Sequence, residues 1–395
     1  MIYMTYWFWV FAVPSLILFY IAPVGRAKKA ALVLSSIIFH THFAGPAGVV
    51  PIVILGIFTY FSALSGRSVL IKTAMLSNVF ALIFYKYTFF FFEHTLRPLF
   101  PEFFSSGSSG LWWQSIVPPL AISFFSFEFI HYLYDVLKGS RPLKNWWDFS
   151  LFAIFWPSIV AGPVKRYQSF VDELHQAIGR RLLPGDAYLG AVRIASGYFK
   201  KIVADNLTMY ILAKEQLFLE LPFLTRWIIL FLIAMRIYLD FSGYTDMALG
   251  FAKLMGIKLP ENFNWPYVSK NLVEFWRRWH MSLSLWIRDY VYIPLGGSRH
   301  GLARKIFSGL LAFFICGLWH GAAWNFAIWG VIHGLGIAIC GNYRKISFLK
   351  PVGALMDRAP FLAWLVTFLF VCFSWLYFFY PAETAFRMMK ALVSL

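Results

Sequence analysis

Long apolar runs separated by short polar connections dominate the pattern of the chain. A helix needs about 20 apolar residues to cross the hydrocarbon core of a bilayer, and several runs reach or approach that length. Some runs are short or interrupted, so the pattern predicts about ten helices that span the membrane or insert partly into it. The candidate segments are residues 5–24, 30–44, 46–64, 70–92, 111–137, 147–160, 224–239, 306–316 continuing to 340, and 361–380.

We predict a single membrane domain, residues 1–395. The length and continuity of its apolar runs change along the chain. Residues 1–137 hold ordinary apolar helices with few charges, residues 138–340 hold short runs broken by glycine, proline and basic residues, and residues 341–395 form a C-terminal helical region. Irregular backbone persists at membrane depth only where it is buried in protein or lines a wet cavity. The middle region therefore predicts re-entrant segments around a funnel.

Composition indicates the same class of protein. The chain is 60% hydrophobic and only 13% charged, whereas soluble domains carry about 25% charged residues. We therefore expect an all-α, multi-pass integral membrane protein. The first apolar segment has no basic stretch before it and no small-residue cleavage site after it, so we expect a retained helix rather than a signal peptide.

The net charge of +17 follows partly from membrane topology. Basic residues follow every second apolar segment in the N-terminal region, which the positive-inside rule assigns to the cytoplasm. This places the connection 138–144 in the cytoplasm, and the N-terminus and the serine- and glycine-rich loop 105–110 on the outer side.

Further basic clusters exceed what topology requires. Membrane lipid headgroups would explain them, and so would an anionic substrate carried on phosphate groups; both explanations stay open. Nucleic acid is not an expected partner, because the chain has no soluble basic domain to bind it. The clusters are Lys165 with Arg166, Arg180 with Arg181, Lys200 with Lys201, Arg277 with Arg278, and the segment 299–305.

His320 is the leading candidate for chemistry. It lies in a run hydrophobic enough for a bilayer, next to Trp319, and the small residues Gly317 and Gly321 on either side of it predict a close approach of another helix. An ionisable group at membrane depth costs roughly 3 kcal/mol or more, so such groups usually mark function. A neutral imidazole can take a proton from a hydroxyl near pH 7. The alternative is a histidine that hydrogen-bonds to a neighbouring helix for packing.

Other ionisable residues precede and follow His320. His280, beside Arg277 and Arg278, would either orient His320 or the acceptor, or lie at the membrane interface. His333 lies well round the helix from His320, and this spacing does not favour a metal site, so we predict none. Buried carboxylates need partners, so Asp240 and Asp246 are expected to pair with nearby cations rather than to line a substrate path. Arg288 and Asp289 complete the set of candidates between the two histidines.

Two segments carry a resemblance to a known family. RIYLDFSGYTDMALGFAKLMGIKLPENFNWPYVSKNLVEFWRRWHMSLSLWIRDYVYIPLGG, followed by GLWHGAAWNFAIWG, resembles the membrane-bound O-acyltransferase (MBOAT) family. Within it, the chain is most similar to the bacterial branch that holds the alginate O-acetylation membrane protein and the D-alanyl transfer membrane protein of teichoic acid modification. ISFFSFEFIHYLYDV, AGPVKRY and GYFKKIVADNL also resemble the helices of this family.

The resemblance implies a fold, a reaction and site residues. His320 matches the catalytic histidine of the family and His280 its second, more variable polar position. The implied fold is a ring of helices around a central funnel, in the bacterial inner membrane. The implied reaction moves an acyl group from a thioester, on coenzyme A or a carrier-protein phosphopantetheine, to a hydroxyl, and it needs no tightly bound cofactor. The acceptor is often an extracytoplasmic polysaccharide, reached with help from an extracytoplasmic acyltransferase partner.

Candidate donor-binding residues lie around this motif and in the AGPVKRY segment. Trp286 is a further candidate for an acyl tunnel, although packing explains it equally well. The candidates are Arg277, Arg278, Arg288, Asp289, Lys165, Arg166, Trp319, Trp324 and Asn325.

Several functions stay open at this point. The motif favours acetyl over D-alanyl as the transferred group, and it does not name the polymer. A glycan transporter would also suit an intramembrane histidine with nearby cations, although the chain shows no paired repeats. A non-catalytic scaffold of a polymer-secretion complex would tolerate the loss of His320.

Overall fold

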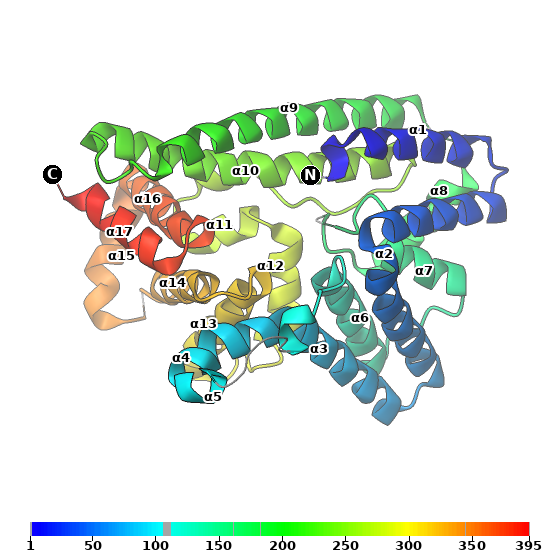
Figure 1. Cartoon of the computed structure of the whole chain (residues 1–395), viewed down its shortest axis with the longest axis horizontal. Coiled ribbons are helices and arrows are strands. Elements are labelled where there is room, and N and C mark those ends of the chain that lie inside the picture. Colours follow the sequence, from blue (N-terminus) through cyan, green and yellow to red (C-terminus); the bar gives the residue numbers. More distant parts are fainter. Residues whose placement is uncertain (1, 106–111, 161, 182, 344, 395) are drawn as a thin grey trace. The chain divides into compact units, whose positions relative to one another are not determined.

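A computed structural model of the chain describes residues 2–105, 112–160, 162–181, 183–343 and 345–394. Every regular element in these ranges is helical, which confirms the predicted all-α class (Figure 1). The chain divides into two compact units. Unit 1 comprises Met1–Ser196 with Tyr244–Pro260, and unit 2 comprises Gly197–Gly243 with Glu261–Leu395. The single domain and the central funnel stay predictions.

Unit 1 contains most of the N-terminal helices. The predicted helices 30–44 and 46–64 form one element, which kinks at Gly45, where the φ angle of 65° suits glycine because it has no Cβ. The loop 105–110 and the start of the predicted segment 111–137 lie outside the described residues. The elements are η1 (Ile2–Met4), α1 (Tyr6–Ile21), α2 (Arg26–Ser65), α3 (Ser68–Phe91), η2 (Phe92–Leu96), α4 (Arg97–Leu99), α5 (Pro101–Ser105), η3 (Trp112–Ser115), α6 (Ile122–Leu137), α7 (Trp146–Ile154) and α8 (Tyr167–Gly179).

Two long helices contribute to both units, and unit 2 holds all later elements. The apolar run predicted from 306 to 340 is two helices, because α13 ends at His320 and α14 begins at Trp324. The elements are α9 (Pro184–Glu215) and α10 (Phe223–Leu254), then η4 (Pro266–Val268), α11 (Leu272–Arg278), α12 (Met281–Ile287), η5 (Arg288–Tyr292), α13 (Gly301–His320), α14 (Trp324–Cys340), η6 (Ser347–Leu349), α15 (Lys350–Arg358), α16 (Pro360–Phe379) and α17 (Ala382–Val393).

Four of the described helices are long and apolar enough to cross a membrane. They are Ala47–Ser65, Ser68–Leu99, Gly301–His320 and Pro360–Phe379, and Tyr6–Ile21 and Trp324–Cys340 are shorter apolar helices. The short helices α11 and α12, joined at a sharp turn, match the broken pattern that the sequence predicted between residues 138 and 340.

Residues 188–206, in the middle of α9, have one apolar face. Its apolar face is exposed, with Val192, Phe199 and Ile202 at 47%, 70% and 51% of their full accessible surface. Lys201 lies off that face, is only 5% exposed, and pairs with Asp205 and Asp240. The apolar side of α9 is therefore exposed, whereas the buried Lys201 on its other side contacts Asp240 of α10.

Candidate active site

His320 is the last residue of α13, three residues after Gly317, where that helix contacts α14. A Cβ added at Gly317 would overlap the Phe326 carbonyl oxygen and would lie 3.1 Å from the Gly330 Cα. A Cβ at Gly330 would overlap the Phe313 carbonyl in turn. The glycines therefore let two backbones touch, which confirms the close approach expected from the small residues around His320.

Aromatic rings surround His320 on several sides. Its ring centroid lies 4.9 Å from Trp319, 5.3 Å from Trp329 and 5.1 Å from Phe378. Trp319 is 7% exposed and Trp329 fully buried, whereas His320 is partly exposed. The imidazole thus lies among apolar rings while part of its surface stays accessible.

His280 lies beside His320, with 6.3 Å between the ring centroids. It occupies the sharp turn between α11 and α12, where its φ of 42° and ψ of 51° are left-handed. This conformation costs a residue with a side chain on the order of 1–3 kcal/mol and persists only where the surroundings hold it. Backbone strain of this kind is typical of a functional position. The His280 side chain is buried, with 1% of its surface exposed.

Asn262 holds His280 in place. The Asn262 Oδ1 lies 3.4 Å from His280 Nδ1 and accepts from the Ser282 backbone N–H at 3.3 Å and from its hydroxyl at 2.6 Å. The Asn262 backbone carbonyl also accepts the Met281 N–H at 3.0 Å. Because the backbone N–H only donates, the atom facing it is the amide oxygen, and His280 Nδ1 must then carry a proton. In the neutral ring, Nε2 keeps its lone pair and can accept a proton from a hydroxyl.

His333 belongs to a separate, fully satisfied chain of hydrogen bonds. The Trp276 indole N–H donates to His333 Nδ1 at 3.2 Å, so His333 Nε2 carries the proton and donates to Ser374 Oγ at 2.9 Å. The Ser374 hydroxyl then donates to the Val371 carbonyl at 2.7 Å. His333 therefore joins α11, α14 and α16 behind the Trp329 ring, 4.8 Å away, and serves packing.

The candidate donor-binding arginines of unit 2 differ in whether a carboxylate already pairs with them. Arg277 is exposed and forms no ion pair with any residue that the structure describes. Arg278 pairs with Glu274 at 2.9 Å. Arg288 pairs with its neighbour Asp289 at 2.7 Å, and this hydrogen bond raises the pKa of the guanidinium, which keeps its charge. Arg277 is thus the cation best placed to meet an incoming anion.

Of three further candidate residues, one is exposed and two are in contacts that hold helices together. Trp324 is 50% exposed at the start of α14, whereas Trp286 is buried 5.3 Å from Tyr290. The Asn325 amide donates to the Tyr377 carbonyl at 3.0 Å. Carbonyls in the last turn of a helix lack intrahelical partners, so Asn325 ties the start of α14 to the end of α16.

Lys165 and Arg166 belong to unit 1. Lys165 is 1% exposed and lies 2.5 Å from the Glu128 carboxylate, over the rings of Phe152 and Phe170. A buried lysine already paired in this way is poorly placed to bind a donor without breaking the pair. The structure therefore favours a structural role for Lys165.

The expectation that Asp240 and Asp246 pair with cations is confirmed. Asp246 lies 2.7 Å from Arg193, and Asp240 lies 2.8 Å from Lys201.

The sequence analysis missed the residues that contact and orient the two histidine side chains. Asn262 lies in the polar segment LPENFNWPY, which showed irregular backbone but gave no signal for one asparagine. Trp329 and Phe378 come from two helices whose apolar pattern marks only burial, and Phe378 is far from His320 in sequence. The hydrogen bonds of Asn262 join a loop to a turn, and neither segment has a periodic sequence pattern from which such contacts could be predicted.

Known proteins resemble this chain over most of its length. The model of the MBOAT, membrane-bound O-acyltransferase, family matches residues 122–380. A peptidoglycan O-acetyltransferase of Helicobacter pylori is 32% identical over 413 residues, which cover 93% of this chain and 74% of that protein. A teichoic acid D-alanyltransferase of Bacillus subtilis is 31% identical over 67% of this chain and 69% of its own length.

The alginate branch is also represented. A probable alginate O-acetylase, AlgI, of Pseudomonas aeruginosa is 38% identical over 287 residues, or 71% of this chain. The matched region covers 52% of that protein, so the chain spans about half the length of this relative.

Proposed function

This chain belongs to the membrane-bound O-acyltransferase family and is a multi-pass membrane acyltransferase, and we propose that it moves an acetyl group from a cytoplasmic thioester to a hydroxyl of an extracytoplasmic polysaccharide. The observation that carries the proposal is the pairing of a partly exposed His320 with a buried, oriented His280, both of them beside the Trp319 ring. The O-acetyltransferase names of two relatives support acetyl as the group and a glycan as the acceptor.

The chemistry needs one base and an activated acyl group. In our proposal, His320 takes the proton of the acceptor hydroxyl as its oxygen attacks the thioester carbonyl. The new C–O bond forms, the C–S bond breaks, and the imidazolium returns its proton to the leaving thiolate. A second version has His320 carry the acyl group briefly before the hydroxyl takes it. Both versions leave His320 unchanged at the end.

The surroundings of His320 support a base that works in a dry site. Trp319, Trp329 and Phe378 pack around the His320 ring and shield part of it from water, and a low local dielectric strengthens each remaining polar contact. His280, with Nε2 as its acceptor atom, is placed to orient the hydroxyl or the His320 ring. Arg277 offers an exposed cation for the phosphates of coenzyme A or phosphopantetheine.

Donor identity is the main alternative. The relative that transfers D-alanine to teichoic acid matches 67% of this chain, so a D-alanyl thioester on a carrier protein is the second candidate donor. We further propose the bacterial inner membrane as the location, an outer-side N-terminus, and an extracytoplasmic acyltransferase as the partner that helps this chain to reach the polymer. The basic connection 138–144 supports this orientation.

The test is labelled acyl transfer by purified full-length protein in detergent. Radiolabelled acetyl-coenzyme A is supplied to the wild type, to His320→Ala and to His300→Ala. His300 caps the opposite end of the same helix and is exposed, so it controls for the loss of a histidine from α13. We expect wild type and His300→Ala to cleave the thioester, and His320→Ala to fall by at least the 10²-fold typical of a lost general base.

Two outcomes would contradict parts of the proposal. Full activity in a folded His320→Ala protein would remove His320 from the mechanism. Turnover with a D-alanyl carrier thioester but not with acetyl-coenzyme A would replace the acetyl donor by the alternative one. Comparable size-exclusion profiles for all three proteins show that any loss is chemical.

A further inference from the structure

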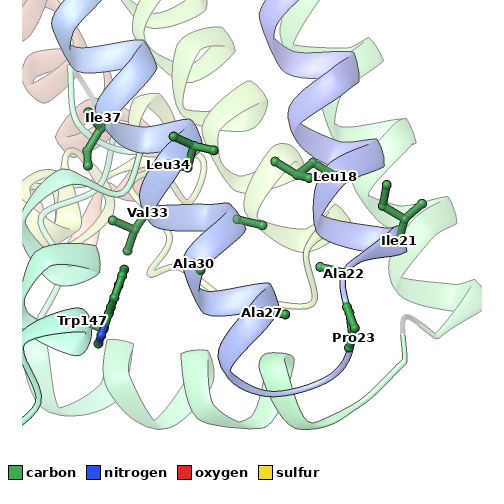
Figure 2. A pocket seen from close by; sticks show the side chains of 11 residues that line it. Leu18, Ile21, Ala22, Pro23, Ala27, Ala30, Val33, Leu34, Ile37 and Trp147 are labelled. Atoms are coloured by element: carbon green, nitrogen blue, oxygen red, sulfur yellow. The ribbon is translucent and has the colours of Figure 1, made fainter.

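An open apolar groove of about 680 Å³ runs between α1 and α2 in unit 1 (Figure 2). Its lining combines small apolar side chains with larger ones. Several of the latter are well exposed, including Ile21 at 72% and Leu34 at 51%. The lining residues are Leu18, Ile21, Ala22, Pro23, Ala27, Ala30, Ala31, Val33, Leu34, Ile37 and Trp147.

The length of the groove matches one leaflet of a bilayer. Along α2 the lining extends from Ala27 to Ile37, a rise of roughly 15 Å at about 1.5 Å per residue. The hydrocarbon core is about 30 Å thick, so half of it is also about 15 Å. A hydrocarbon chain anchored at one membrane surface would fill the groove, whereas a membrane-crossing helix of a partner would need a longer one.

The charge beside the groove identifies the other end of the ligand. Arg26 directly precedes the lining residue Ala27 and is exposed. The Gly25 N–H donates to the Ile178 carbonyl, and Lys28 Nζ donates to the Arg180 carbonyl at 3.0 Å, which brings the end of α8 to this turn. Arg181 follows and is also exposed.

These cations outnumber the carboxylates that meet them. Asp148 pairs with Lys29 at 2.5 Å, and Asp186 pairs with Arg180 at 3.2 Å. Arg26 and Arg181 form no ion pair with a described residue. Two free guanidinium groups at the end of a leaflet-long apolar groove are complementary to a phosphate joined to a hydrocarbon chain.

We propose that this groove is a specific site for a membrane phospholipid with an anionic headgroup. One acyl chain lies along Ala27, Ala30 and Leu34, and the phosphate lies at Arg26 and Arg181. Trp147, 48% exposed at the start of α7, lies against the glycerol region, where indoles favour the membrane interface. The site is separate from the histidines and does not depend on the proposed reaction.

Native mass spectrometry of the full chain, released from micelles with added lipid, tests the site. Phosphatidylglycerol and phosphatidylcholine with identical acyl chains are compared. We expect the wild type to retain phosphatidylglycerol preferentially. The double variant Arg26→Gln/Arg181→Gln, which changes only exposed side chains, should lose this preference, with binding about fivefold weaker for each arginine removed.

A second pair of variants tests the groove itself. Ala30→Trp fills the groove, and Val53→Trp places the same side chain on an exposed part of α2 that does not line it. We expect Ala30→Trp to lower phosphatidylglycerol retention at least tenfold and Val53→Trp to leave it unchanged. Equal retention of both lipids by the wild type, or equal retention by both tryptophan variants, overturns the proposal. A dimer that Ala30→Trp converts to monomer overturns it as well, because a second copy would then occupy the groove.

Discussion

The imidazole rings of His280 and His320 lie 6.3 Å apart, centroid to centroid, with their planes at 58°. His320 takes its place from the glycine contact of α13 with α14, and His280 takes its place from a strained turn held by Asn262. Two separate backbone segments thus bring the two imidazoles to the same aromatic ring, that of Trp319. Each segment can be perturbed without touching either imidazole, and each perturbation makes a separate prediction.

Replacing Asn262 by alanine should reduce catalysis more than binding. The change removes the acceptor of His280 Nδ1 and of Ser282, so the His280 ring loses its orientation. A small misplacement of a catalytic group costs up to about 100-fold in rate. We expect kcat to fall about 10- to 100-fold with little change in the donor KM, measured in the labelled transfer assay.

Two variants separate this effect from general damage. Asn262→Asp keeps an acceptor oxygen and should recover most of the activity. Asn264→Ala alters an exposed residue of the same loop, whose hydrogen bonds to the described residues are all made by its backbone, and it should behave as wild type. An aspartate variant as inactive as the alanine variant would exclude the positioning role.

Replacing Gly317 by alanine should separate α13 from α14. The added Cβ would overlap the Phe326 carbonyl oxygen, which is backbone and cannot rotate away. Overpacking of this kind costs about 1–3 kcal/mol of folding free energy, and it moves His320, three residues later. We expect a lower denaturation midpoint in detergent together with a loss of acyl transfer.

Gly309→Ala is the matched control on the same helix. A Cβ there would meet nothing within 4 Å, and alanine favours a helix over glycine by up to about 1 kcal/mol. This variant should be as stable as wild type or more so, with full activity. Equal stability of the two alanine variants would show that the glycine contact does not hold the helices together.

Replacing Ser374 by alanine should destabilise the fold without removing the chemistry. His333 Nε2–H would lose its acceptor in a fully buried site, and an unpaired buried donor costs about 1–3 kcal/mol. Thr367→Val on the same helix removes a hydroxyl that bonds only its own helix, at the Ala363 carbonyl. Chemical denaturation should show the larger loss for Ser374→Ala, and a larger loss for Thr367→Val would contradict the hydrogen-bond chain described for His333.

The sequence predicted what depends on hydrophobic runs and motif residues, and it did not predict what depends on contacts between distant residues. The helical class, the division into apolar helices and the glycine packing around His320 follow from local patterns. The split at His320 was hidden, because the run 306–340 stays apolar across the break. Lys165 is an example of a charge whose partner, Glu128, lies far away in sequence, in α6, so the sequence suggested donor binding where the structure shows an ion pair.

The Lys165–Glu128 pair provides the last prediction. Removing one partner leaves a buried charge, which costs roughly 3–5 kcal/mol, whereas replacing both by apolar residues is often neutral or stabilising. Lys165→Met should therefore lower the denaturation midpoint strongly, and Lys165→Met/Glu128→Leu should restore it. If Lys165 serves only this pair, the double variant also keeps the donor KM of the wild type. A donor KM raised at least tenfold in a stable double variant would instead return Lys165 to the donor site.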